Sequence, residues 1–235
     1  MRLFVGTSGY SYREWKGSFY PEKLPNKQML SYYAERFNSV EINGSFYRLP
    51  SASTLQPWAK EVPNDFQFTF KAPQSITHFK RLKVAGEPTK EFIQATGVLK
   101  ARLGPLLFGL PKNFKKDLPR LQEFLKQLSR GLRVAFEFRH PTWFDEEVFD
   151  CLRANRCALC VNDDKEESPW TEKLVRTTDW GYLRLRRKAY TGKAFANWIK
   201  KLKAQKWNEA YVFFKHEETG TGPKLATRFI ELANS

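Results

Sequence analysis

Cysteine and histidine are scarce in this chain, which restricts the metal and redox sites that it can build. Its 235 residues include three cysteines and three histidines. An odd, low cysteine count argues against a disulfide framework. Cys157 and Cys160 form a C-x-x-C pair, but they lie in a predicted strand, where residues three apart point to opposite faces. We therefore expect buried structural thiols rather than a metal clamp.

Long apolar runs are also absent. No stretch of the sequence approaches the roughly 20 consecutive apolar residues that a membrane-spanning helix needs. The opening residues, MRLFVGTSGY, resemble the start of a strand and lack the apolar segment and cleavage site of a signal peptide. These features predict a cytoplasmic protein with no membrane partner.

The sequence contains neither a glycine-rich dinucleotide fingerprint nor a P-loop, which argues against an open nucleotide-binding sheet. It contains instead strand-like and helix-like stretches in alternation. The predicted strands are 2–8, 39–43, 66–73, 105–111, 133–139, 157–163, 180–186 and 209–215. The predicted helices are 27–37, 53–62, 88–103, 117–128, 145–154, 193–205 and 222–233. Only the link 164–180 lacks a convincing helix.

Eight such units in about this length predict one (β/α)8 barrel with parallel strands, a TIM-barrel-like fold. No linker or change of composition divides the chain, so we expect a single domain over residues 1–235. A doubly wound open sheet is the alternative.

Acidic residues are outnumbered, and the excess of positive charge predicts an anionic partner. The chain carries 40 Lys and Arg against 25 Asp and Glu, a net charge of +15. Residues 180–208 contain nine Lys or Arg and no acid, with Tyr190, Phe195, Trp198 and Trp207 between them. This pattern is typical of nucleic-acid binding. It is equally typical of an amphipathic helix with a solvated face.

Four of the predicted strands carry a polar face where a buried parallel strand should be apolar. In a barrel the helices cover the apolar face, so the polar face points inward. Glu41, Lys71, Glu137, Arg139 and Arg184 would then converge at the carboxyl end of the barrel. They predict an active or binding site there. A purely structural ion network is the alternative.

Paired carboxylates and cations suggest two kinds of chemistry at this end. Glu41 and Glu137 are the candidate catalytic residues, with roles in proton transfer or metal binding. Lys71, Arg139 and Arg184 would clamp an anion, because arginine suits bidentate recognition of phosphate or carboxylate. Other potential metal ligands near strand ends are His140, Asp163 and His216. They do not form a recognisable metal motif, and no cofactor is indicated.

A long connection, SGYSYREWKGSFYPEKLP at residues 8–25, follows the first strand and holds five aromatic residues. Long ordered loops are often functional. These aromatic side chains could stack on a ligand or plug the barrel mouth.

Several stretches resemble the YecE-like family, catalogued as domain of unknown function 72. The resemblance is carried by GTSGYSYREWKGSFYPEKLP, YYAERFNSVEINGSFYRLPS, FQFTFKAPQSITH and VAFEFRHPTWF, from Gly6 to about Asp163. It implies a TIM-barrel-like fold and a family without a settled activity. The C-terminal third departs from the family pattern, reading RLRR at 184–187. The motif positions are Gly6, Ser8, Gly9, Trp15, Phe19, Tyr20, Pro21, Glu41, Asn43, Phe46, Tyr47, Lys71, Pro73, Glu137, Arg139, His140 and Trp143.

These observations predict a cationic, carboxylate-bearing pocket that binds an anionic, phosphate-containing ligand. One alternative is a nucleic-acid-binding protein, with or without phosphodiester chemistry. Another is a non-enzymatic interaction protein with an internal ion network. Besides the two glutamates, the predicted ligand-binding residues are Ser8, Trp15, Asn43, Tyr47, Lys71, Arg139, His140, Trp143, Asp163, Arg184 and Arg186.

Overall fold

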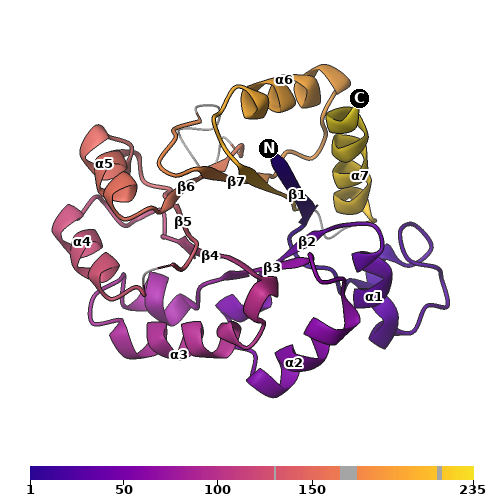
Figure 1. The fold of residues 1–235 in the computed structure, drawn as a ribbon, viewed down its shortest axis with the longest axis horizontal. Helices are drawn as coiled ribbons and strands as arrows, with labels where there is room; N and C mark the ends of the chain where they lie inside the picture. The colour runs from indigo at the N-terminus through magenta and orange to yellow at the C-terminus, as the bar shows by residue number, and fades with distance from the viewer. Residues whose placement is uncertain (130, 165–173, 216–218) are drawn as a thin grey trace.

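A computed structural model of the chain describes residues 1–129, 131–164, 174–215 and 219–235. Its centre is a ring of eight strands (Figure 1). The strands are β1 (Arg2–Thr7), β2 (Ser39–Ile42), β3 (Gln67–Lys71), β4 (Leu103–Gly109), β5 (Val134–Glu137), β6 (Ala158–Asn162), β7 (Trp180–Leu185) and β8 (Glu209–Phe214). The strands β2 to β7 each pair in parallel with the strand that follows in sequence, and β8 also pairs in parallel with β1.

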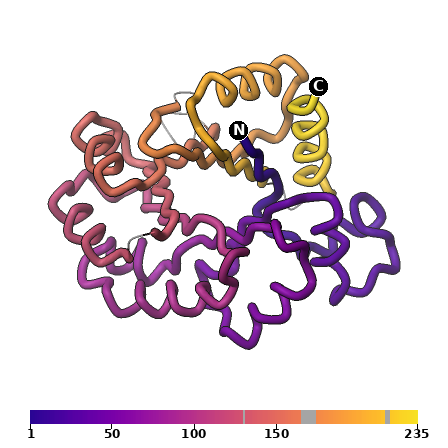
Figure 2. Tube along the Cα trace, in the orientation of Figure 1, coloured from indigo at the N-terminus to yellow at the C-terminus, as the bar shows by residue number. Residues whose placement is uncertain are grey.

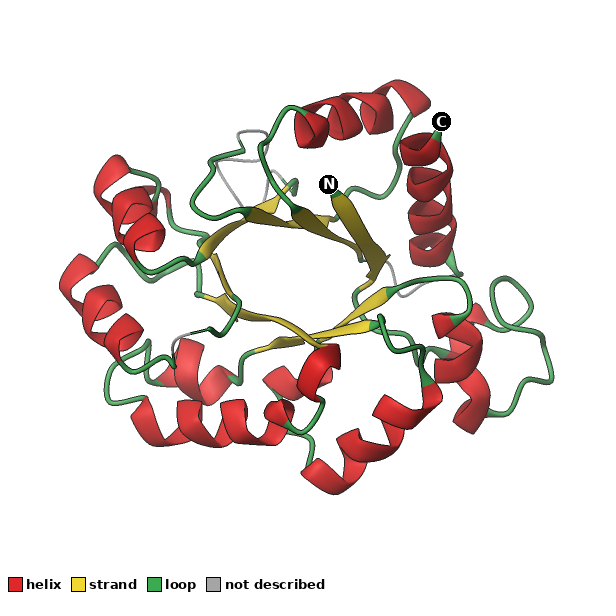
Figure 3. Ribbon diagram, in the orientation of Figure 1, coloured by secondary structure: helices red, strands yellow, loops and turns green. Residues whose placement is uncertain are grey.

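Helices surround this ring (Figure 3) and connect the strands in the predicted order. They are α1 (Met29–Ala34), α2 (Ala52–Glu61), α3 (Gly86–Gly97), α4 (Leu118–Lys126), α5 (Glu146–Ala154), α6 (Gly192–Lys203) and α7 (Thr221–Asn234). The predicted (β/α)8 arrangement is confirmed, as a nearly closed barrel. Most of the weak link 164–180 lies outside the described residues. Helix α3 ends at Gly97, earlier than predicted, because Lys100–Arg102 form a short 3-10 turn before β4.

The apolar faces of the strands pack outward against the helices, as the sequence pattern predicts. On β3 these residues are Phe68 and Phe70, and on β5 they are Val134 and Phe136, all buried in the main core. Asp117 and Asp145 begin α4 and α5 as N-caps, since their side chains accept hydrogen bonds from Arg120 N and Val148 N. Capping carboxylates satisfy backbone donors that the first helical turn leaves unpaired.

A second apolar cluster fills the inside of the barrel beneath its carboxyl end. Phe4 of β1 stacks on Tyr211 of β8, with ring centroids 4.6 Å apart. Cys160 lies in this inner cluster, whereas Cys157 lies in the outer core, so the two thiols are buried on opposite faces as predicted. The remaining members are Leu107, Ala135, Ala158, Trp180, Tyr182 and Phe213. The interior is therefore a packed core, as in other barrels of this size.

The barrel has one seam, between β1 and β2, where no regular ladder forms. A single isolated bridge joins Ser8 to Glu41, and Gly9 N donates to the Glu41 carbonyl at 2.8 Å. Further down, the Asn38 side chain takes the place of a backbone partner for β1. Its Oδ1 accepts from Val5 N at 2.9 Å, and its Nδ2 donates to the Leu3 carbonyl at 2.8 Å.

Tyr33 of α1 completes the seam from outside. Its hydroxyl accepts from Thr7 N at 2.8 Å and donates to the Ser39 carbonyl at 3.0 Å. Gly6 makes this arrangement possible, because an added Cβ would lie 1.9 Å from the Ser39 carbonyl oxygen and 2.6 Å from the Tyr33 hydroxyl. Side chains thus replace the backbone hydrogen bonds that the other seven strand junctions use.

We predict that Tyr33→Phe lowers the free energy of unfolding by about 1–3 kcal/mol, because it leaves buried backbone groups of Thr7 and Ser39 without this partner. Urea unfolding would measure the change. Tyr32→Phe is the matched control, since Tyr32 is only partly buried, and it should change stability by less than about 0.5 kcal/mol. Equal losses in the two variants would contradict the role of Tyr33 in the seam.

Candidate functional site

The polar strand faces converge at the carboxyl end of the barrel, which we call the mouth. Glu41 of β2, Glu137 of β5 and Arg184 of β7 are buried there, each at most 1% exposed. The three residues are far apart in sequence but meet at the centre of the ring. We call Glu41, Asn43, Glu137 and Arg184 the Arg184 network.

Arg184 donates hydrogen bonds through every nitrogen of its guanidinium. Nε and Nη2 donate to Glu41 Oε1 at 3.2 and 2.7 Å, and Nη2 also donates to Asn43 Oδ1 at 3.3 Å. Nη1 donates to both carboxylate oxygens of Glu137, each at 3.0 Å. These contacts engage all three nitrogens of the guanidinium.

The two carboxylates have further partners below and beside Arg184. Glu41 accepts from the Ser8 hydroxyl at 2.6 Å and from the Tyr182 hydroxyl at 2.7 Å. Glu137 accepts from Asn162 Nδ2 at 2.9 Å and from Arg139 Nη2 at 3.3 Å. The network therefore joins strands β1, β2, β5, β6 and β7.

These contacts keep both glutamates ionised. Burial alone raises the pKa of Glu41, but the charge and hydrogen bonds of Arg184 outweigh it, so that the pKa is lowered. The same balance of burial against Arg184 and Arg139 sets the pKa of Glu137 well below its ordinary value. Neither group holds a proton at neutral pH, so neither can act as a general acid there. Both glutamates compensate the charge of Arg184, and their predicted proton-transfer roles stay a prediction.

The predicted role of Arg184 needs a correction for the same reason. The sequence suggested that Arg184 clamps an anionic ligand, but its donors are already taken by Glu41, Glu137 and Asn43. Binding an anion through Arg184 would require breaking these buried contacts, and an ion pair that loses a partner in the interior is strongly destabilised. Arg184 holds the site together from beneath it.

Lys71 occupies a different position at the end of β3. Its Nζ lies 4.0 Å from the centre of the Phe46 ring, and among the described residues no ion pair involves it. Burial, then the charges of Arg184 and Arg139, lower the pKa of Lys71 to about 8, although Glu137 acts in the opposite direction.

Gly109 of β4 lies between Lys71 and Glu137 and leaves room between them. A Cβ built at Gly109 would lie 3.0 Å from Glu137 Oε2 and 3.6 Å from Lys71 Cε. The absence of a side chain from β4 at this level lets the other two approach the same space.

The mouth holds more positive than negative charge. His78 follows β3 and is affected by the same positive charges. Burial, and then the charges of Lys71 and Arg139, lower its pKa to about 4. Arg186 lies close enough to both glutamates to lower their pKa values. The carboxylates are Glu41 and Glu137, and the cations are Lys71, Arg139, Arg184 and Arg186.

Two predicted ligand-binding residues, Trp15 and Trp143, are buried away from the mouth. Trp143 is fully buried and stacks on Phe138 at 4.7 Å, and its Nε1 donates to the Phe114 carbonyl at 2.7 Å. Trp15 is 1% exposed and contacts Tyr20 at 6.0 Å between ring centroids. The structure gives both indoles packing roles, and their predicted part in ligand binding stays a prediction.

The long first connection also packs differently from either expectation. It extends outward beside α1 (Figure 2), and Phe19 contacts Tyr33 and Phe37 while Tyr20 contacts Tyr32. Its aromatic side chains thus add to the core around α1 instead of covering the mouth or presenting rings to a ligand.

The remaining predicted site residues differ in their placement. Asp163 is buried and accepts from the Tyr190 hydroxyl at 2.5 Å and from Arg186 N at 2.6 Å. Its pKa is raised by burial. His140 is partly buried, and its Nδ1 accepts from Thr142 N as the cap of a short turn. Tyr47 is 77% exposed.

Sequence reasoning selected Asp163 and missed its neighbour Asn162. The alternation of β6 supplies the signal, because Cys160 points into the barrel and the residue two positions later does the same. Asn162 is that residue, and it donates to Glu137. Tyr182, His78 and Gly109 were also not selected.

The basic stretch 180–208 is divided between the two ends of the barrel. Arg184 and Arg186 lie at the mouth, whereas α6 runs back toward the start of β8. Its last turn carries Lys200, Lys201 and Lys203 at the opposite end. Phe195, Trp198, Ile199 and Leu202 are buried, which confirms the amphipathic character of this helix.

Neither a metal centre nor a membrane span is found in the described ranges. Within them, no three His, Cys, Asp or Glu side chains are grouped so as to hold a metal ion, and His216 lies outside the described residues. None of the helices in these ranges combines the length and apolar character that a membrane crossing requires. A cytoplasmic location stays a prediction.

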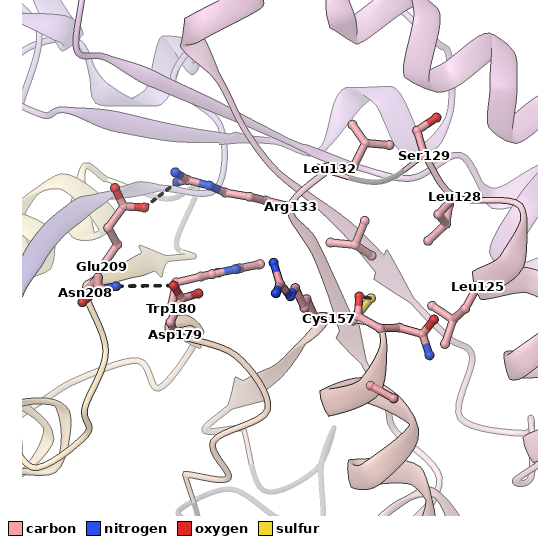
Figure 4. Close-up of a pocket in the computed structure, with 15 residues that line it drawn as sticks. Leu125, Leu128, Ser129, Leu132, Arg133, Cys157, Asp179, Trp180, Asn208 and Glu209 are labelled. Atoms are coloured by element: carbon pink, nitrogen blue, oxygen red, sulfur yellow. Dashed lines mark hydrogen bonds and ion pairs between the residues drawn. The ribbon is translucent and has the colours of Figure 1, made fainter.

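A cavity of about 800 Å³ lies at the end of the barrel opposite the mouth (Figure 4). It is lined by residues at the starts of β5, β7 and β8, among them Arg133, Trp180 and Glu209. Arg133 pairs with Glu209 and donates to the Tyr211 hydroxyl at 2.6 Å. In barrels this end contributes to stability, while sites form at the carboxyl end. We therefore place the candidate site at the mouth.

Comparison with known proteins identifies the relatives of this barrel. A family model described as "Protein of unknown function DUF72" matches residues 4–235. This chain belongs to the DUF72 family. The match extends to the C-terminus, so the departures at 184–187 are variations within DUF72 and the relationship covers more than the expected Gly6–Asp163.

Three DUF72 relatives illustrate the similarity. UPF0759 protein YunF of Bacillus subtilis (strain 168) is 25% identical over 229 residues, covering 92% of this chain and 79% of YunF. UPF0759 protein YecE of Escherichia coli (strain K12) is 34% identical over 116 residues, covering 49% of this chain and 43% of YecE. A DUF72 crystal structure from Thermotoga maritima MSB8 has 28% identity and a TM-score of 0.85, covering 100% of both chains.

We predict that Arg184→Met lowers the free energy of unfolding at neutral pH by about 3–5 kcal/mol, because buried Glu41 loses the guanidinium that it pairs with and Glu137 keeps only the longer contact with Arg139 as an ion pair among the described residues. Urea unfolding across a pH series would measure it. In the wild type the lowered glutamate pKa values stabilise the fold above the ordinary value of 4.5, and this contribution is lost as the pH falls. The difference between wild type and variant should therefore shrink below about pH 4.5.

Two further variants test the cause of the loss. Arg228→Met removes an exposed ion pair with Glu231 and should change stability by less than about 1 kcal/mol. Adding Glu137→Gln to Arg184→Met should restore part of the lost stability, since one uncompensated charge is removed. A double variant less stable than Arg184→Met would contradict charge compensation as the role of Arg184.

Proposed function

We propose that the mouth of this DUF72 barrel binds a small anionic, phosphate-containing ligand through Arg139 and Lys71. The observation that carries the proposal is the unbalanced charge of the mouth. Among the described residues, the two carboxylates of the Arg184 network face four cations, Lys71, Arg139, Arg184 and Arg186, whose charges contribute to the lowered pKa values of Glu41, Glu137 and Lys71. A bound anion would offset this excess and lower the repulsion among the cations.

The cations of the mouth differ in burial, and this difference supports the same proposal. Arg184 pairs with both buried glutamates. Arg139 and Lys71 stand farther out and are partly exposed, with the Arg139 side chain 17% accessible. Lys71 borders the space left by Gly109, and Arg139 contacts Glu137 on the other side of that space. A guanidinium beside an amine is well suited to phosphate, because arginine offers two parallel donors and lysine a point charge.

The chemistry of the carboxylates favours binding over acid–base catalysis as the first function to test. Glu41 and Glu137 act by fixing Arg184, and the groups that titrate nearest neutrality are cationic. The expected nucleic-acid alternative rested on the 180–208 stretch, whose cations are divided between the two ends of the barrel. The interaction-protein alternative shares the internal ion network with this proposal but does not account for the charge excess above it.

Titration calorimetry with inorganic phosphate at low ionic strength tests the proposal. We expect saturable binding by the wild type and about tenfold weaker binding by Arg139→Met, equivalent to about 1.4 kcal/mol. Lys203→Met is the control, because it removes an exposed cation at the opposite end of the barrel. The proposal fails if the wild type shows no saturable binding, or if Lys203→Met weakens binding as much as Arg139→Met.

The lowered pKa of Lys71 predicts a pH dependence of binding. Sulfate is the suitable probe, since its own charge does not change across this range. Lys71 is protonated below about pH 8 and neutral above it, so wild-type affinity for sulfate should fall as the pH rises through 8. Lys71→Met should bind sulfate weakly without this step. A step of the same size in Lys71→Met would assign the titration to another group.

A further inference from the structure

Exposed aromatic side chains cluster beside the cationic mouth. Four large hydrophobic side chains are highly exposed among the described residues, namely Met1, Tyr47, Phe79 and Val84. Tyr47, 77% exposed, follows β2, and Phe79, 73% exposed, follows β3. Because β2 and β3 are neighbours in the sheet, both side chains emerge at the carboxyl end of the barrel on the side of Lys71.

Ring contacts link Tyr47 to the proposed anion site, while Phe79 comes directly after His78 in the chain. Phe46 packs edge-to-face on Tyr47 at 5.0 Å and on His78 at 4.9 Å. The same Phe46 ring supports Lys71 Nζ at 4.0 Å. We call Phe46, Tyr47, His78 and Phe79 the aromatic rim. His78 contributes a neutral ring, since its pKa is lowered to about 4 by burial and by Lys71 and Arg139.

The backbone that presents Phe79 is unusual. Residues Ser75–Phe79 form a single π-helical turn, a feature often found at functional sites. Arg81, Leu82 and Val84 follow with φ angles of 47°, 67° and 47°. Such left-handed conformations are strained for residues other than glycine and cluster at ligand-binding segments. The fold thus holds a large aromatic ring in solvent where burial would be expected.

We infer that the ligand of the mouth is a nucleoside monophosphate, whose phosphate lies on Arg139 and Lys71 and whose base stacks on the exposed rings of Tyr47 and Phe79. The inference rests on the proposed function and names the class of its ligand. The aromatic rim supplies flat apolar surface, the cations supply the complementary charge, and Phe46 joins the two. Stacking of a base on an aromatic side chain contributes enough to be measured by single substitutions.

A matched pair of probes isolates the contribution of the base. Adenosine 5′-monophosphate and ribose 5-phosphate carry the same phosphate and sugar, and only the first has a base. We expect the nucleotide to bind about tenfold more tightly in titration calorimetry. Inorganic phosphate, measured alongside, reports on the anion site itself.

Variants of the aromatic rim then show where the base lies. Phe79→Ala and Tyr47→Ala should each remove most of the advantage of the nucleotide and leave affinity for ribose 5-phosphate unchanged. Both side chains are exposed, so the fold should tolerate these changes. Val84→Ala is the matched control, because Val84 lies in the loop that follows Phe79 and is 78% exposed but has no ring. This variant should still bind the nucleotide more tightly than ribose 5-phosphate.

The outcomes separate this inference from the proposed function. If phosphate and ribose 5-phosphate bind but the nucleotide binds no better, base stacking is wrong and the anion site stands. If none of the probes binds, the anion site is wrong and the inference falls with it. An advantage that persists in both Phe79→Ala and Tyr47→Ala would also overturn the inference. So would a short single-stranded oligonucleotide that binds far more tightly than the nucleotide, with a steep salt dependence.

Discussion

The guanidinium of Arg184, buried between two carboxylates, fixes the geometry of the whole carboxyl end of the barrel. An arginine in the interior is tolerated only when its charge and its donors are compensated. Here Glu41 and Glu137 supply the charge, and Asn43 completes the set of acceptors. A lysine could not replace it, because an ammonium lacks the planar fork that reaches both carboxylates at once. Glu41, Glu137 and Asn43 thus fix the guanidinium, and the proposed anion site consists of the side chains above them.

The sequence pattern was sufficient for the barrel and for the inward direction of its polar residues. Alternating faces on 39–43, 133–139 and 180–186, combined with helices between the strands, left only the interior for Glu41, Glu137 and Arg184. Pattern alone could not tell that Arg184 meets both glutamates, because that contact depends on positions across the ring separated by 143 and 47 residues. Pattern alone also could not place Trp15 or Trp143. Both belong to the family motifs, but a motif does not tell whether a side chain faces the mouth or packs in the core.

The two ends of the barrel show different uses of the same residue types. At the mouth, Lys71 and Glu137 border a space that Gly109 keeps open, and around the Arg184 network the described cations outnumber the described carboxylates. At the other end, Arg133 is matched by Glu209 and by the hydroxyl of Tyr211, and lysines of α6 occupy the last turn of a helix, where cations are favourable. The net charge of +15 is therefore less informative than the positions of the charged residues. A cation contributes to recognition only where the fold leaves its charge uncompensated.

The seam between β1 and β2 has a consequence for how this protein associates when it is damaged. Every other junction is a parallel ladder, with one shift of register between β3 and β4, but here a few side chains, chiefly Asn38 and Tyr33, hold two strand edges together. Ser8 and Glu41 fasten the same seam from inside through the Arg184 network. Losing these contacts would turn a closed ring into a curled sheet with two bare edges. Bare edges pair with other chains, so aggregation of this protein should begin at β1 and β2 before the rest of the barrel unfolds.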